Sequence, residues 1–131
     1  MATGRRDYTW GFVSESSAGS RCVESFCKTV HLIYQSGEYK EIYSYTVPKG
    51  KRLLLNNIIL STEGGITTYA YVYIDSDAIS SIRFSENVII PYPDASPVYV
   101  HAEQKLKVMM GNPDSVSVGM MCNVIAALET L

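Results

Sequence analysis

"SVSVGMMCNVIAAL" (residues 115–128) carries an apolar side chain at every second position along almost its whole length. A period of two is the pattern of a β-strand, in which successive side chains point to opposite faces of a sheet. A strand this long with one apolar face usually crosses an entire sheet, so we expect it to lie against the core. The residues that share the apolar parity are Val116, Val118, Met120, Cys122, Val124, Ala126 and Leu128.

Alternation with a period of two also dominates the rest of the chain from about Cys27 onward. No segment has the period near 3.6 of a convincing amphipathic helix. The chain is therefore predicted to be all-β, an antiparallel β-sandwich of jelly-roll type with roughly seven or eight strands. The other candidate strands are 41–47, 52–61, 66–75, 78–84, 87–92, 97–103 and 105–111, where 78–84 and 87–92 form either one bent strand or two short ones.

Turn residues separate these segments. Pro, Lys and Gly fill the turn at 48–51, and Gly-Asn-Pro-Asp at 111–114 is the clearest hairpin signal in the chain. Three prolines between 91 and 97 predict a loop, because proline cannot donate a hydrogen bond to a ladder. The segment 52–61 is apolar on both parities, as expected for a central strand, and Asn56 and Asn57 interrupt it.

The N-terminal part differs in composition, so we divide the chain into an extended arm, residues 1–26, and a β-sandwich domain, residues 27–131. The arm is rich in Gly, Ser and charge, yet Tyr8, Trp10 and Phe12 alternate within it. It has no apolar stretch or cleavage site of a signal peptide, and no apolar run in the chain is long enough to cross a membrane. We therefore expect synthesis in a reducing cytoplasm.

Composition and charge exclude several classes of partner. The chain has 131 residues, of which 47% are hydrophobic and 18% charged, as in one ordinary folded domain. Its formal net charge is −2 and its 11 Lys and Arg are scattered, which argues against nucleic acid or a membrane as a partner. The three cysteines, Cys22, Cys27 and Cys122, form neither a disulfide framework nor a CxxC metal motif.

No residue pattern in the sequence indicates catalysis. His31 and His101 lie far apart, and neither has a nearby acid or thiol at the spacing of a metal site or general base. Cys27 and His31 share a strand face, but a cluster with Cys122 would require neighbouring strands and a fourth ligand, so we expect no metal. Asp-Ser-Asp at 75–77 is typical of a turn. We predict neither an enzyme, such as a small cupin with clustered metal ligands, nor a cofactor.

The stretch "TTYAYVYID" (67–75) suggests a surface instead. In this stretch three tyrosines alternate with three aliphatic residues, so on a strand the two sets point to opposite faces. The aliphatic face suits the core, because a buried tyrosine hydroxyl needs a hydrogen-bond partner. Tyr43 and Tyr45 show that a second strand also favours tyrosine. Tyrosine is enriched at binding surfaces, so we predict an interface or ligand face, which meets the chain's own arm, a neighbouring subunit or a sugar. Its candidate residues are Tyr69, Tyr71 and Tyr73, with Tyr8, Trp10 and Phe12 from the arm.

Three stretches, "YSYTVPKGKRLLLNNIILST", "YVYIDSDAI" and "VSVGMMCNVI", give the chain a resemblance to small β-sandwich virion proteins of tailed bacteriophages. The resemblance covers about residues 40–128 and is structural rather than a site signature. It implies a non-enzymatic virion component, of capsid decoration or tail and fibre-attachment type, that docks through the arm and the aromatic face. It also implies virion proteins and further copies of the chain as partners, with assembly in the host cytoplasm.

The alternative hypothesis is a carbohydrate-binding sandwich. In that case the tyrosine stripe stacks on sugar rings, and Asp75, Asp77 or Asn87 accept hydrogen bonds from sugar hydroxyls.

Overall fold

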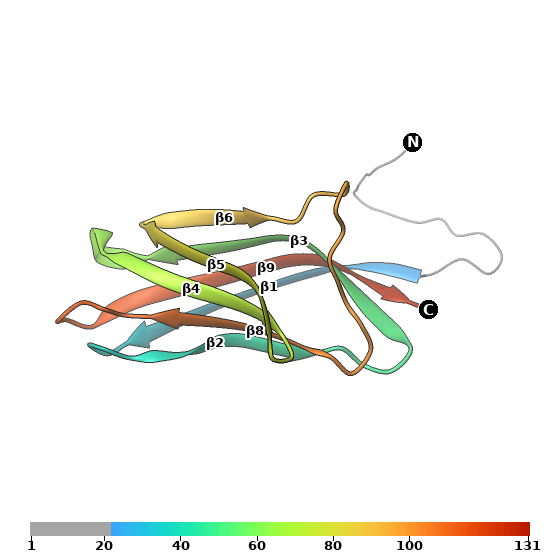
Figure 1. Ribbon diagram of the computed structural model, residues 1–131, viewed down its shortest axis with the longest axis horizontal. Coiled ribbons are helices and arrows are strands. Elements are labelled where there is room, and N and C mark those ends of the chain that lie inside the picture. The colour runs from blue at the N-terminus through green and yellow to red at the C-terminus, as the bar shows by residue number, and fades with distance from the viewer. Residues whose placement is uncertain (1–21) are drawn as a thin grey trace.

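The alternating segments form two antiparallel sheets packed face to face in a computed structural model that describes residues 22–131 (Figure 1). The predicted all-β sandwich is confirmed, and the described part of the chain has nine strands where seven or eight were predicted. The five-stranded sheet has the order β1 (Cys22–Tyr34), β9 (Val118–Thr130), β3 (Lys51–Thr62) and β6 (Asn87–Pro91), and β7 (Tyr99–Val100) also pairs with β3. The four-stranded sheet has the order β2 (Tyr39–Thr46), β8 (Lys105–Gly111), β4 (Thr67–Ile74) and β5 (Asp77–Ser85).

Strand β9 lies in the middle of the larger sheet, between β1 and β3. Its alternate residues from Val118 to Leu128 are all buried, which confirms the parity predicted from the sequence. Val116 shares that parity but precedes the strand and is 58% exposed. Apolar side chains of β3, β4 and β8 also belong to the buried core. They are Leu53, Leu55, Ile58, Leu60, Ala70, Val72, Leu106, Val108 and Met110.

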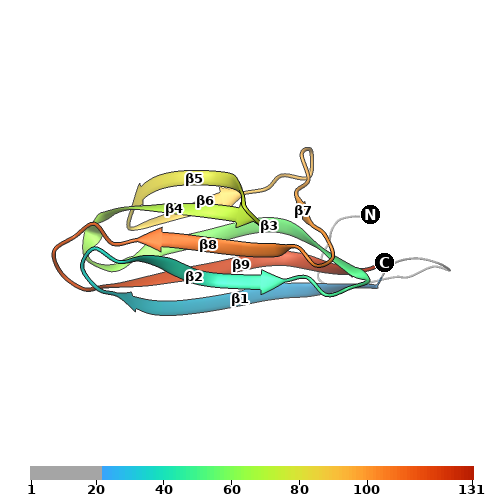
Figure 2. The same ribbon diagram turned by 60° about the horizontal axis from the view of Figure 1, so that its bottom comes forward.

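The segment 78–92 forms two strands in different sheets. Strand β5 belongs to the four-stranded sheet and β6 to the five-stranded sheet, and they lie side by side in both views (Figures 1 and 2). The chain crosses at Glu86, which has a positive φ of 67° and whose carbonyl accepts a hydrogen bond of 2.7 Å from the Thr62 amide. Of the two alternatives that the sequence left open, two short strands is therefore correct.

A β-bulge reverses the expected parity of β2. The register of β2 against β8 shifts between Glu41 and Tyr43, and Tyr43 then pairs with buried Val108. Tyr43 and Tyr45 consequently pack against the core, in contrast to the outward orientation suggested by their tyrosine pattern. Bulges add one residue to one strand, so every later side chain changes face.

Strand β1 begins at Cys22, so residues 22–26, which we assigned to the arm, are paired with β9. Phe26 is buried, and its ring centroid lies 4.7 Å from that of Tyr45. The arm residues Tyr8, Trp10 and Phe12 lie outside the described residues. Between residues 22 and 131, no helix has the length and apolar character needed to span a membrane.

Candidate functional site

The three tyrosines of β4 lie on the outer side of the four-stranded sheet. Ala70 and Val72, on the other parity, are fully buried, and Ile74 is partly buried against the core. The tyrosine side chains are half-buried rather than fully exposed. The parity argument from the sequence therefore placed the core side of this strand correctly.

A fourth tyrosine completes the cluster. Tyr39, at the start of β2, stacks on Tyr69 with a ring centroid distance of 5.8 Å and an interplanar angle of 18°. It meets Tyr71 edge-on at 6.1 Å, and Tyr71 also lies 6.0 Å from Tyr69 and 6.3 Å from Tyr73. We refer to Tyr39, Tyr69, Tyr71 and Tyr73 as the tyrosine face. Sequence reasoning missed Tyr39 because a single tyrosine beside a turn shows no alternation.

Gly111 makes room for the stacked pair. It ends β8, where it is the register partner of both Tyr39 and Tyr69. A Cβ atom on Gly111 would lie only 2.3 Å from Cζ of Tyr69, so the ring occupies the space that a side chain would need. A glycine covered by an aromatic ring from a neighbouring strand is a known way to stabilise a sheet. Gly111, predicted to belong to a turn, thus supports the face directly.

Tyr39 keeps its phenolic proton at ordinary pH. Burial raises the pKa of Tyr39 to about 12, with a hydrogen bond to Tyr73 and the neighbouring tyrosines as further causes. One cation, the Lys107 Nζ, lies 5.1 Å from the centroid of the Tyr73 ring. The Tyr39 and Tyr69 rings are stacked on each other, which leaves less flat area for a sugar than four free rings would offer. The surface combines apolar area with phenolic hydroxyls, a combination typical of protein interfaces.

The cysteines and histidines form no metal or catalytic cluster. Strands β1 and β9 are neighbours, as a Cys27, His31 and Cys122 site would require, but Cys122 is buried in the core while the other two side chains are exposed. Burial raises the pKa of the Cys122 thiol to about 12, so this thiol is unreactive. No group of three potential metal-ligating side chains occurs among residues 22–131.

The remaining candidates have structural positions. His31 lies 3.8 Å from a carboxylate oxygen of Glu63, and His101 stacks on Tyr99 at 6.1 Å. Asp75 sits in the β4–β5 turn, as predicted, with a positive φ of 55°. Its carboxylate accepts a hydrogen bond of 2.9 Å from the Lys105 amide, which ties that turn to β8.

Comparison with known proteins identifies a shared fold. No protein-family model and no curated protein matches the sequence. A chain from the structure of Bacillus endospore appendages, a family of disulfide-linked pili, is similar over 92% of this chain and 99% of its own length. The TM-score is 0.55 and the sequence identity 12%, so the likeness is one of fold.

Two virus structures resemble the chain more weakly. The structure of infectious bursal disease virus Gx strain matches 86% of this chain and 32% of its own, with 13% identity and a TM-score of 0.37. The VP2 subviral particle of infectious bursal disease virus matches 83% and 40%, with 10% identity and a TM-score of 0.28.

Proposed function

We propose that the protein is a non-enzymatic structural subunit that assembles with further copies of itself and with other proteins of a particle or filament. The observation that carries this proposal is the tyrosine face, where four tyrosines from two non-adjacent strands gather on one outer sheet surface. Clustered, partly exposed aromatic residues are the residues that contribute most to protein–protein binding. The sandwich supplies a rigid support, and the arm supplies a second contact.

The finer form of the hypothesis concerns the kind of particle. The resemblance to tailed-phage virion proteins favours a capsid decoration or tail and fibre-attachment component, assembled in the host cytoplasm. The fold shared with the endospore appendage chain favours a filament subunit. Both forms require repeated contacts between copies.

A test of the tyrosine face is the molar mass of the purified chain in solution. We expect an oligomer, and we expect Tyr71→Ala to dissociate it because Tyr71 contacts the other three rings. Tyr99→Ala is the matched control, since Tyr99 is a partly exposed tyrosine on the other sheet. Deleting residues 1–20 should leave a folded monomer. A wild-type chain that is monomeric at all concentrations would contradict the proposal.

The cysteines allow a covalent form of assembly. Cys22 and Cys27 are exposed on β1, and their five-residue separation along a strand corresponds to about 16 Å, whereas a disulfide needs Cα atoms within about 7 Å. They cannot pair with each other within one chain, and Cys122 is buried. Any disulfide through these thiols must therefore join two chains, as in the pili that share the fold.

The corresponding experiment is electrophoresis without reductant after treatment with oxidised glutathione, which accepts the two electrons from each thiol pair. We expect a ladder of linked chains that collapses on reduction. Cys22→Ser or Cys27→Ser alone should stop the ladder at dimers, since one exposed thiol can join only two chains, and Cys122→Ala should keep it. A ladder that survives in the Cys22→Ser/Cys27→Ser double variant would refute this linkage.

A further inference from the structure

Asn56 and Asn57 interrupt the apolar strand β3 at a β-bulge. Leu55 pairs with Ala126 and Asn57 with Ile125, so Asn56 is the extra residue on this strand. Both asparagines are half-buried. Asparagine is disfavoured in strands, and a bulge is a common way to redirect side chains beside a binding site.

The bulge coincides with an opening in the sheet. Along the edge that faces away from β9, β3 pairs with β7 before the bulge and with β6 after it. The chain between β6 and β7 leaves the sheet as a loop. The Leu55 amide donates a 3.0 Å hydrogen bond to the Val98 carbonyl, and the Tyr92 amide donates one of 2.9 Å to the Asn56 carbonyl. These bonds hold both ends of the loop. They leave a pocket of about 260 Å³, lined by Asn56, Asn57, Pro91, Tyr92, Pro93 and Asp94.

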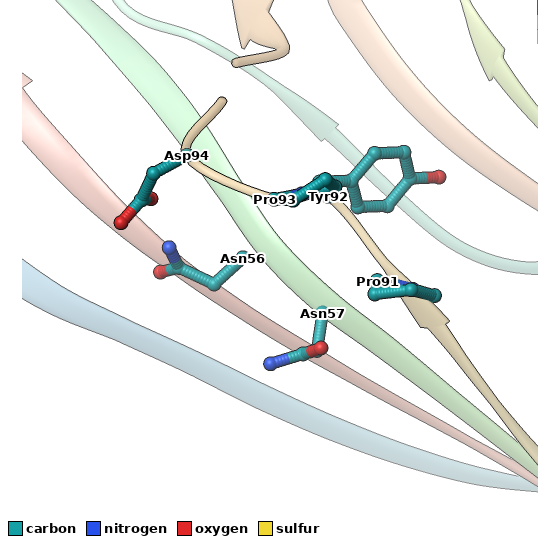
Figure 3. A pocket seen from close by; sticks show the side chains of 6 residues that line it. All are labelled: Asn56, Asn57, Pro91, Tyr92, Pro93 and Asp94. Carbon is teal, nitrogen blue, oxygen red and sulfur yellow. The ribbon is translucent and has the colours of Figure 1, made fainter. Parts of the chain in front are cut away.

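Polar groups converge on this pocket. Figure 3 shows the Asp94 carboxylate and the Asn56 amide pointing to the same side, with the Asn57 amide beside them. Within residues 22–131, none of these three side chains has a hydrogen bond or ion pair with another residue. The Tyr92 ring points away, and its hydroxyl lies 3.1 Å from the Ser80 hydroxyl. No residue in the described part of the chain therefore competes with a ligand for these three side chains.

We propose that this pocket binds one ring of a neutral sugar. Two amides offer both donors and acceptors, and one carboxylate offers a strong acceptor, which together match adjacent sugar hydroxyls. Two proline rings add apolar surface for the C–H side of a sugar. A pocket of about 260 Å³ has room for a single ring and is much larger than a bare ion requires.

A hard cation fits the site less well. Calcium takes about six to eight oxygen ligands, whereas this pocket presents three side chains that carry one negative charge between them. The sugar site lies on the five-stranded sheet and not on the tyrosine face, so it does not depend on the proposed assembly.

The test is a titration of the ¹⁵N-labelled chain, followed by amide chemical shifts, with glucose, galactose and N-acetylglucosamine separately. We expect saturable shifts for Asn56, Asn57 and Asp94 with at least one sugar and a Kd on the order of 1 mM, as suits a small open pocket. Asp94→Ala should weaken binding about tenfold, because it removes a charged acceptor. Glu24→Ala is the matched control, an exposed carboxylate of β1 outside the pocket, and should leave the Kd unchanged.

The outcomes are distinguishable. Three results would each overturn the inference. They are chemical-shift changes confined to the tyrosine face, changes caused by calcium chloride but by none of the sugars, and no saturable change at all. Sugar binding that is the same in Asp94→Ala as in the wild type would overturn it as well. Asp94 lies in an exposed loop, so this variant is expected to fold even if Asn57→Ala does not.

Discussion

Replacing Gly111 by alanine would place a methyl group within 2.3 Å of Cζ and 2.5 Å of the hydroxyl oxygen of Tyr69. Neither distance is tolerable, so the Tyr69 ring must swing away. It would then lose its stacked contact with Tyr39 and its edge contact with Tyr71.

The magnitude follows from the contacts that are lost. Each aromatic pair contributes about 0.5–1.5 kcal/mol beyond its buried area, so two pairs amount to about 1–3 kcal/mol. Alanine is intrinsically better than glycine in a strand by about 0.5–1 kcal/mol, which partly offsets the loss. We expect Gly111→Ala to lower the free energy of unfolding by about 1 kcal/mol, and therefore the urea midpoint by roughly 0.3–1 M.

The decisive comparison is the same substitution in a Tyr69→Ala background, where no ring covers the glycine. There Gly111→Ala should be neutral or stabilising, so the double-mutant cycle should show a coupling of about 2 kcal/mol. Equal destabilisation by Gly111→Ala in both backgrounds would show that the ring and the glycine are independent.

Two further predictions concern a buried side-chain amide and the dependence of stability on pH. The buried Asn112 amide donates to the carbonyls of Tyr34 and Val116 at 3.1 and 2.9 Å, so Asn112→Ala should lower the free energy of unfolding by about 2–3 kcal/mol. Urea unfolding measures this, and a loss below about 0.5 kcal/mol, typical of a surface site, would contradict it. Folding raises the pKa of Tyr39 from 10.0 and that of Cys122 from 9.0, each to about 12. Because the unfolded chain deprotonates first, stability should be full below pH 9 and fall from pH 9 to 12; thermal unfolding that is unchanged across this range would refute the assignment.

The sandwich could be predicted because alternation is a local signal that burial enforces. The parity of β9 is an example, since a shift by one residue would expose every core side chain from Val118 to Leu128. Alternation does not indicate which sheet a strand joins, so the sequence of residues 78–92 is compatible with one bent strand or two short ones.

The sites were harder to predict because bulges and cross-strand contacts produce no recognisable pattern in the local sequence. Tyr43 changes face at a bulge whose residues are ordinary strand formers. Tyr39 and Gly111 meet across a strand pair, far apart in the sequence. The interruption at Asn56 and Asn57 was visible, but the loop that turns it into a pocket arrives only with residues 91–94.

The place of β9 has a consequence for synthesis. This strand separates β1 from β3, yet it is the last element in chain order. While a ribosome is still adding its residues, β1 lacks its neighbour among the described strands, and β3 has an unpaired edge on the side that β9 will occupy. The larger sheet thus closes only after translation has passed residue 118, and crowded nascent chains are exposed to strand exchange until then.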